Sequence, residues 1–297
     1  MGNSMILNSK NNQTLNLEKI NVICNLEHKN ADKIAQNIVE ILENKGIACQ
    51  REDIQAACTQ QARTYNQDAT FVIVIGGDGT LLSTARFYAK FDIPVFGINS
   101  GRLGFLAQLN PEDIEAGIKK LLNGEFKIEQ RIMLKAYDSD KKISFDALND
   151  IVVKGGTLSR TARLYLYINN KHVCDYLADG LIVSTPTGST AYTLSAGGPV
   201  LSPLLDAFVI VPICAHSLTV RPLVVPSSET IEIRTCAECE LTYLTADGQE
   251  NYRLETNDRI IIEKNEKNAK LVLLEKENNG FYSVLREKLH WGVSPKG

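Results

Sequence analysis

The stretch Phe71-Val-Ile-Val-Ile-Gly-Gly-Asp-Gly-Thr80 decides the fold of the first part of the chain. Its opening residues, 71–75, are all apolar, which is typical of a parallel strand buried on both faces. The glycines that follow permit a tight turn, and the residues from Thr80 to about Lys90 have a helical pattern. The stretch therefore predicts a strand, a short turn and a helix, which together form the repeating unit of an α/β domain.

The segments on either side of this stretch repeat the alternation. Residues 20–24 predict a strand, and residues 31–45 predict an amphipathic helix that ends at Gly46. Another apolar strand is expected at 94–98, and Asn110-Pro111 begins a helix with a capping residue and a proline in its first position. This alternation predicts an open α/β domain, which we assign to residues 20–125.

The pattern changes at about Phe126, where short β-prone runs begin to alternate with polar or glycine-containing turns. Such runs predict a β-rich second domain over residues 126–274. A helical pattern returns at 281–290, and we expect the segment 275–297 to pack back on the first domain. The β-prone runs are 127–137, 151–154, 164–168, 181–184, 208–211, 231–234, 241–245 and 259–262.

The first 21 residues are rich in asparagine. They contain neither the basic segment nor the apolar segment of a signal peptide. We expect them to form a disordered lead-in before the first strand.

Composition and charge exclude several classes of protein. With 297 residues and a net charge of −3, the chain lacks the basic excess of a nucleic-acid-binding protein. No apolar run approaches the ~20 residues that cross a membrane. The seven cysteines are scattered and odd in number, as expected of reduced thiols in a cytoplasmic protein. Cys236 and Cys239 lack the second pair that zinc requires, so we expect no protein-held metal.

The glycine-rich turn after the strand 71–75 predicts a phosphate site. It lies at the carboxyl end of a parallel strand, where ligands bind, and its bare N–H groups and the following helix N-terminus attract anions. The carboxylate of Asp78 would repel phosphate unless it accepts a proton from a hydroxyl or helps hold a metal. The alternative is a plain strand-to-helix turn in which Asp78 caps the helix. The lysine of a P-loop is absent.

A second candidate site is the segment Asp179-Gly-Leu-Ile-Val-Ser-Thr-Pro-Thr-Gly-Ser-Thr-Ala-Tyr192. A strand here runs into a loop of small hydroxyl residues, and a helix is expected to start at about Thr190. Such a loop offers hydroxyl and backbone donors with little bulk to exclude a flat ring, which Tyr192 could stack on. The alternative is a loop of hydroxyl turns that only caps the helix.

Taken together, these motifs resemble the NAD kinase family over nearly the whole chain. The Gly-Gly-Asp-Gly element alone is less specific, since diacylglycerol and sphingosine kinases and phosphofructokinases carry close variants. The segment 179–192 is far more diagnostic. The matching motifs are 76–80, Asn149-Asp150, 179–192, Gly101-Arg-Leu-Gly-Phe-Leu106, Arg221-Pro-Leu223 and Asp247-Gly-Gln249.

The resemblance implies roles for particular residues. Asp78 matches the catalytic aspartate, the proposed base for a ribose 2′-hydroxyl, and Asn149 and Asp150 match a pair that binds the ribose of NAD. The matching phosphate-loop residues are Gly76, Gly77 and Gly79. The implied NAD-binding residues are Asp78, Gly79, Phe105 near the adenine, Asn149, Asp150, Arg160, Asp179, Thr190, Ala191, Tyr192, Ser195 and Gln249.

The implied activity is transfer of the terminal phosphoryl group of ATP to the 2′-hydroxyl of the adenosine ribose of NAD, giving NADP. A divalent cation, Mg²⁺, would arrive with the nucleotide, and polyphosphate would suit the same loop as a donor. The implied fold is an α/β domain with a β-sandwich-like second domain. Family members in which Asp179 reaches a neighbouring subunit's ligand imply a homo-oligomer, commonly a tetramer.

Two rival functions share parts of this pattern. A diacylglycerol-type lipid kinase has the same glycine loop, but no basic amphipathic helix for a membrane surface is apparent in this sequence. A non-catalytic dinucleotide sensor would have the same fold, but a carboxylate at Asp78 beside phosphates makes a poor site for binding alone.

Overall fold

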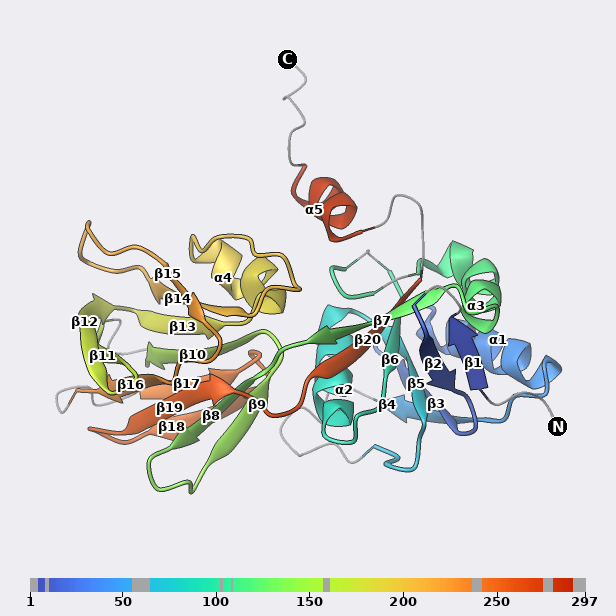
Figure 1. Cartoon of the computed structure of the whole chain (residues 1–297), viewed down its shortest axis with the longest axis horizontal. Coiled ribbons are helices and arrows are strands. Elements are labelled where there is room, and N and C mark those ends of the chain that lie inside the picture. Colours follow the sequence, from blue (N-terminus) through green and yellow to red (C-terminus); the bar gives the residue numbers. More distant parts are fainter. Residues whose placement is uncertain are drawn as a thin grey trace, which may run out of the picture. The chain divides into compact units, whose positions relative to one another are not determined.

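The computed structural model describes residues 5–8, 11–54, 65–101, 104–107, 109–156, 161–236, 242–274 and 280–290. The chain forms two compact units (Figure 1). The first consists of Met1–Gln130 and Ala269–Gly297, and the second of Arg131–Asn268. Among the described residues, no helix is both long enough and apolar enough to cross a membrane.

The first unit is built on a six-stranded sheet with the order β4-β3-β5-β6-β20-β7. Strands β3, β4, β5, β6 and β20 pair in parallel, as the alternation of strands and helices in the sequence predicts. The strands are β3 Ile20–Asn25, β4 Cys49–Ile54, β5 Phe71–Gly76, β6 Val95–Asn99, β20 Ala269–Leu274 and β7 Phe126–Arg131.

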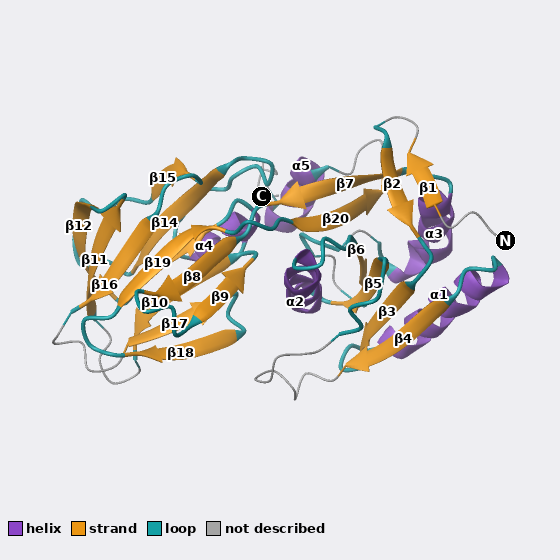
Figure 2. Cartoon of the chain, turned by 60° about the horizontal axis from the view of Figure 1, so that its bottom comes forward, coloured by secondary structure: helices purple, strands orange, loops and turns teal. Residues whose placement is uncertain are grey.

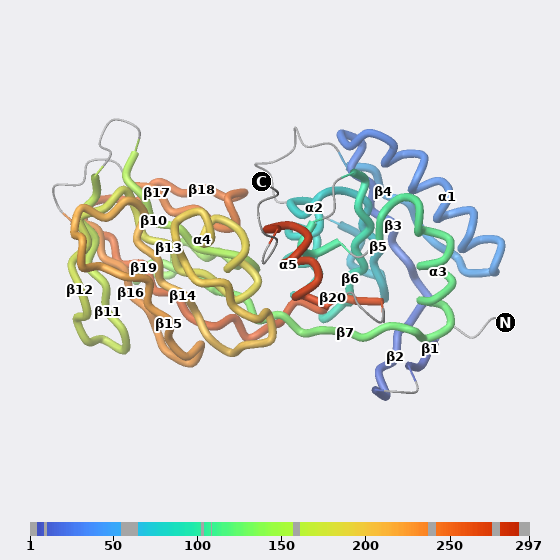
Figure 3. The backbone as a smooth tube through the Cα atoms, turned by 90° about the horizontal axis from the view of Figure 1, so that it is seen from above, coloured from blue at the N-terminus to red at the C-terminus, as the bar shows by residue number. Residues whose placement is uncertain are grey.

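Helices cover both faces of this sheet (Figure 3). The predicted helices are present, and Gly46 ends the first of them in the left-handed region, with φ +72°. The contact of 275–297 with the first domain stays a prediction. The helices are α1 Ala31–Asn44, α2 Asp78–Ala89, the 3-10 turn η2 Pro111–Asp113, α3 Ile114–Leu122 and α5 Phe281–Leu289.

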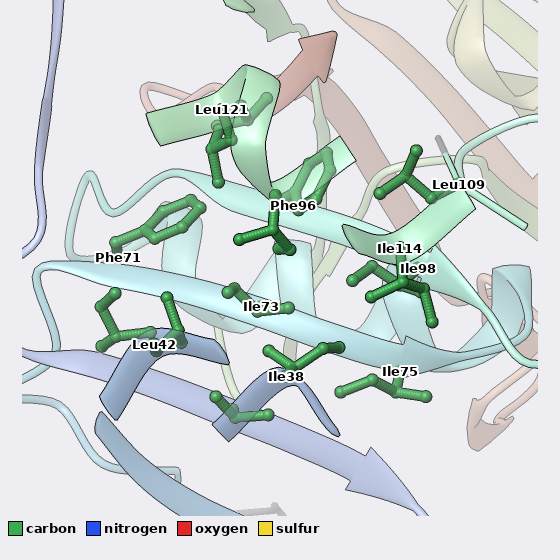
Figure 4. Packing of buried hydrophobic residues seen from close by; sticks show 14 of the residues in the cluster. Ile38, Leu42, Phe71, Ile73, Ile75, Phe96, Ile98, Leu109, Ile114 and Leu121 are labelled. Carbon is green, nitrogen blue, oxygen red and sulfur yellow. The ribbon is translucent and has the colours of Figure 1, made fainter. Parts of the chain in front are cut away.

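Side chains alternate between the two faces of the sheet along β5, and each face packs against different helices. Phe71, Ile73 and Ile75 point into the core between the sheet and the helices α1 and α3 (Figure 4). Val74 points to the opposite face, where its register partner is Gly97 on β6. A Cβ atom at Gly97 would lie only 2.5 Å from Cδ2 of a leucine on α2, so this glycine allows α2 to pack closely.

The N-terminal segment is ordered where the structure describes it, so the expectation of a disordered lead-in is wrong there. Strands β1 Met5–Asn8 and β2 Gln13–Asn16 form an antiparallel hairpin. The Gln13 side chain bonds both backbone groups of Ile128 on β7, donating over 2.9 Å and accepting over 2.6 Å. Leu15 and Leu17 are buried in the core. Composition alone did not reveal this order, because the hairpin is held by contacts with a strand 115 residues away in the chain.

The boundary between the two units differs from the expected one. The single run expected at 127–137 is two strands, β7 and β8 Leu134–Asp138, which belong to different sheets. Strand β20, expected in the β-rich domain, also lies in the first sheet. β propensity does not state which sheet a strand joins, because that depends on pairing with strands distant in sequence.

The second unit contains two six-stranded sheets with the orders β15-β14-β13-β10-β17-β18 and β12-β11-β16-β19-β8-β9 (Figure 2). The pairings that define both sheets are antiparallel, and each β-prone run from 151 onward corresponds to a strand. The strands are β9 Ser144–Ala147, β10 Asp150–Gly155, β11 Ala162–Ile168, β12 Lys171–Ala178, β13 Gly180–Ser184, β14 Ala207–Ile213, β15 Leu223–Pro226, β16 Ile231–Thr235, β17 Thr242–Ala246, β18 Glu250–Leu254 and β19 Arg259–Lys264.

These two sheets enclose one apolar core. Side chains from both sheets contribute to it, among them Ile151 on β10, Val183 on β13 and Ile260 on β19. Ala196 and Leu201 pack on the outer face of β10, β13 and β14. Between β13 and β14 the chain forms the 3-10 turn η3 Thr187–Thr190 and the one-turn helix α4 Tyr192–Ser195. The second unit is therefore a β sandwich with one face covered by the segment that follows η3.

Replacing Gln13 tests the docking of the N-terminal hairpin. Gln13→Ala removes both hydrogen bonds to Ile128 and should weaken the hairpin by about 1–3 kcal/mol, since each such bond contributes roughly 0.5–1.5 kcal/mol. Hydrogen exchange at the Ile128 amide should therefore accelerate. The control is Gln36→Ala on the exposed face of α1. Equal exchange rates in the two variants would contradict the docking of Gln13.

Candidate active site

The glycine loop lies at the carboxyl end of the first sheet. Gly76 ends β5, and Gly77 is the N-cap of α2 in an extended conformation. A Cβ atom at Gly76 would lie 2.8 Å from Oγ1 of Thr80, which accepts a 2.9 Å hydrogen bond from the Asn25 side chain. The loop is thus tightly folded around Thr80. The N-terminus of α2, a helix of 12 residues, begins directly at this edge of the sheet.

The carboxylate of Asp78 is held in a defined position within the first unit. It accepts the N–H of Phe105 over 2.7 Å and the N–H of Leu106 over 3.3 Å. A Cβ atom at Gly104 would lie 1.8 Å from its Oδ1, so only glycine leaves room for the carboxylate. The N-cap of α2 is Gly77, so the alternative in which Asp78 only caps the helix does not account for these contacts. Two backbone donors therefore fix the position of this carboxylate.

Two asparagines at the same edge were not singled out from the sequence. Asn25 ends β3 and bonds Thr80. Asn99 ends β6, and its side chain bonds the N–H and the carbonyl of Gly101 over 3.0 and 3.2 Å. Both follow buried apolar runs, and the carboxyl ends of parallel strands meet at one edge. An asparagine at the end of two buried apolar strands was the sequence signal that could have revealed these residues.

The second group of predicted residues lies in the β sandwich. Asn149 and Asp150 occupy the junction between β9 and β10. The carbonyl of Asn149 accepts the N–H of Thr185 over 2.9 Å and the hydroxyl of Ser184 over 3.1 Å. A Cβ atom at Gly188 would lie 2.2 Å from the same carbonyl. The hydroxyl-rich loop after β13 therefore packs directly on the backbone of Asn149.

Asp150 is buried, with 4% of the residue's surface exposed. Burial raises the pKa of Asp150 to about 7, and the negative charge of Asp247 adds to this effect. A group that titrates near neutrality at a predicted binding site is typical of functional positions.

Other predicted residues belong to the same unit as Asp150. Burial raises the pKa of Tyr192, and the charges of Cys214, Asp150 and Asp179 raise it further. Asp150 and Asp179 therefore both lie within electrostatic reach of Tyr192. Thr190 ends η3, Ala191 links it to α4, and Ser195 ends α4.

One further predicted residue belongs to the same unit, and another lies outside the described residues. Gln249 is in the turn between β17 and β18, where its N–H donates to Ala246. Arg160 lies outside the described residues, as do Cys239 and residues 102–103 of the motif 101–106. Asp78, Phe105 and the glycine loop belong to the first unit, and the sandwich residues belong to the second.

Comparison with known proteins identifies the family. Residues 45–126 match the ATP-NAD kinase N-terminal domain, and residues 148–274 match the ATP-NAD kinase C-terminal domain. The chain belongs to the NAD kinase family. It is 46% identical over 222 residues to an NAD kinase of Clostridium botulinum, which covers 74% of this chain and 78% of that protein. It is 37% identical to an NAD kinase of Caldanaerobacter subterraneus, over 92% of this chain and 99% of that protein.

Solved structures of NAD kinases have the same fold. The crystal structure of an NAD kinase from Archaeoglobus fulgidus in complex with ATP aligns with a TM-score of 0.73 and 28% identity, covering 92% of this chain and 98% of that one. Yeast NADH kinase complexed with NADH aligns with a TM-score of 0.77 at 24% identity, over 94% of this chain and 89% of that one, and shows the fold. The α/β domain and the β-rich domain expected from the sequence are confirmed.

The buried carboxyl of Asp150 predicts a pH-dependent effect on stability. Its pKa is raised from 3.8 to about 7 on folding, so the unfolded chain releases this proton more readily. The resulting penalty on folding grows from about pH 4 to pH 7, on the order of 1.4 kcal/mol per pKa unit. Asp150→Asn removes the titrating proton, so its stability relative to the wild type should be greater at pH 8 than at pH 4.5.

Urea denaturation of both proteins at the two pH values measures this difference. Other ionisable groups are common to the two proteins, so their contributions cancel. If the stability difference is the same at pH 4.5 and pH 8, Asp150 does not titrate as described.

Proposed function

We propose that this member of the NAD kinase family transfers the terminal phosphoryl group of ATP to the 2′-hydroxyl of the adenosine ribose of NAD, giving NADP. The observation that carries this proposal is the carboxylate of Asp78, held by the N–H groups of Phe105 and Leu106 at the first turn of α2. A base fixed beside an anion-attracting helix terminus suits phosphoryl transfer to a hydroxyl. The lipid-kinase and sensor alternatives are not favoured by the family match.

In the proposed reaction the ribose 2′-oxygen attacks the γ-phosphorus of ATP and the bond from that phosphorus to the ADP oxygen breaks. Asp78 accepts the proton of the 2′-hydroxyl. Positioning and neutralisation of charge supply most of the catalysis in such transfers. The N–H groups around Gly76, Gly77 and Gly79 and the positive end of α2 suit the phosphates.

We propose that Mg²⁺ enters as part of the metal–nucleotide substrate. Among the described residues, no group of three or more His, Cys, Asp or Glu side chains is arranged to hold a metal ion. Mg²⁺ commonly binds through substrate phosphates and waters with few protein ligands. Polyphosphate remains a second donor for the same loop.

In the proposed acceptor site, Asn149 and Asp150 bind the ribose hydroxyls of NAD. Their shared junction with β10 and the loop after β13 support this role, since the backbone of Asn149 is fixed by Ser184 and Thr185. The remaining proposed NAD contacts are Asp78, Gly79, Phe105, Arg160, Asp179, Thr190, Ala191, Tyr192, Ser195 and Gln249.

A homo-oligomer, commonly a tetramer in this family, is part of the proposal. Apolar side chains exposed on the sandwich support it, among them Leu218 at 90% and Val224 at 46% exposure. Val224 lies on β15, an edge strand whose free side can pair with another chain. A cytoplasmic location stays a prediction, supported by the scattered and odd-numbered cysteines.

The experiment that tests the function is an assay of the purified protein with Mg²⁺ and a panel of substrates. ATP and NAD should yield NADP, whereas ATP and diacylglycerol should yield no phosphatidic acid. An NAD analogue without the 2′-hydroxyl should bind and yield no phosphorylated product. A phosphorylated product from that analogue would overturn the assignment of the acceptor atom, and binding of NAD without turnover would support a sensor.

Asp78→Asn should lower turnover by roughly 10²–10⁴-fold, the contribution of a general base. The substitution keeps the size of the side chain and removes a negative charge, so binding of NAD should hold or improve, although one of the two backbone N–H groups loses its acceptor. Steady-state kinetics and calorimetric titration with NAD measure the two effects. Turnover within a few-fold of the wild type, in a folded variant, would rule out the catalytic role.

A second variant tests the seat of the carboxylate without changing its charge. In Gly104→Ala, the new Cβ atom would lie 1.8 Å from Oδ1 of Asp78, so the carboxylate must move away from the two N–H groups. Turnover should fall although Asp78 is intact. The matched control is Gly101→Ala, because a Cβ atom there meets nothing within 4 Å.

A further inference from the structure

Asp247 connects the turn between β17 and β18 to the junction that carries Asn149 and Asp150. Its Oδ2 accepts the N–H of Leu148 over 3.1 Å. Its Oδ1 accepts the N–H of Asn149 over 2.7 Å and that of Asp150 over 3.2 Å. The N–H of Asp247 in turn donates to the carbonyl of Asp150 over 2.9 Å. One carboxylate therefore holds three consecutive N–H groups.

This arrangement fixes the backbone from which two proposed ribose ligands project. Leu148 is fully buried, so its N–H requires an acceptor within the protein. A carboxylate is well suited to the task because its two oxygens can accept several bonds at once. The side chains of Asn149 and Asp150 leave this backbone in directions that depend on the three bonds.

Asp247 also acts on Asp150 through its charge. The negative charge of Asp247 adds to burial in raising the pKa of Asp150. The charge of Asp150 in turn contributes to the raised pKa of Tyr192 on α4. Asp247 and Tyr192 are thus the titratable groups seen to interact with Asp150 among the described residues. Asp247 influences both the position and the protonation of its neighbour.

We propose that Asp247 is a positioning residue for the acceptor site, which orients Asn149 and Asp150 toward the ribose of NAD. The proposal rests on the proposed function, because it assigns Asn149 and Asp150 to that ribose. The alternative is that Asp247 only stabilises its turn, where its φ is +52°. Asparagine tolerates this left-handed conformation well, so it would serve the turn equally.

Asp247→Asn separates these roles. The amide oxygen can replace Oδ1 for Asn149 and Asp150, but the amide NH₂ group then faces the buried N–H of Leu148. Because Asn149 and Asp150 then lose their fixed orientation, the KM for NAD should rise about tenfold, or about 1.4 kcal/mol of binding free energy, while the KM for ATP stays unchanged. The midpoint of Asp150 titration, followed by NMR of ¹³C-labelled aspartate in the unliganded protein, should move to lower pH because a neighbouring negative charge is gone.

The matched control is Asp258→Asn. Asp258 also lies in a turn of the sandwich, and its carboxylate accepts one backbone N–H, from Glu255 over 2.7 Å. This variant should leave the KM for NAD and the titration of Asp150 as in the wild type. A second variant, Asp247→Glu, keeps the charge and displaces the oxygens, so it should weaken NAD binding with little change in the Asp150 midpoint. It carries the test if Asp247→Asn fails to fold.

The proposal is overturned if Asp247→Asn binds NAD within twofold of the Asp258→Asn control, whatever the titration of Asp150 does. It is supported if NAD affinity falls and the Asp150 midpoint moves together. A wild-type protein that forms no NADP would instead overturn the proposed function itself. The two failures are distinguishable, because the proposal about Asp247 fails when the wild type is active and Asp247→Asn binds NAD as well as the control does.

Discussion

The two backbone N–H groups that hold the carboxylate of Asp78 are the contact on which the first unit's site depends. They belong to Phe105 and Leu106, which follow β6, whereas Asp78 begins the helix after β5. The contact forms only because these two strands are neighbours in a parallel sheet and both end at the same edge. Gly104 provides the space, and Gly97 lets α2 lie close to the sheet.

The sandwich uses the same physical device. The carboxylate of Asp247 also accepts consecutive backbone N–H groups, and so fixes a segment far away in the sequence. The consequences differ because the surroundings differ. Burial of Asp150 raises its pKa, and the negative charge of Asp247 raises it further. One unit thus holds a carboxylate on two backbone N–H groups, and the other holds a carboxyl group that titrates near neutrality.

Much of the architecture could be predicted from local pattern. Buried parallel strands such as 71–75 are continuous apolar runs, and helix ends such as Gly46 carry their own signals. The N-terminal hairpin could not be predicted in this way, because Gln13 finds its partner on β7. The division of 127–137 between two sheets could not be predicted either. Both β7 and β8 are β-prone runs, and which sheet each joins depends on the strands it pairs with.

The sequence by itself determined the alternation of strands and helices, the glycine loop with Asp78, and the family to which the motifs belong. These features depend on residues close together in the chain, and short-range periodicity and turn chemistry record them. Only the tertiary structure decided what each carboxylate touches. Asp78 meets 104–106, and Asp150 meets Asp247, because strands distant in sequence are brought side by side. Such contacts determine charge and orientation, and no local pattern encodes them.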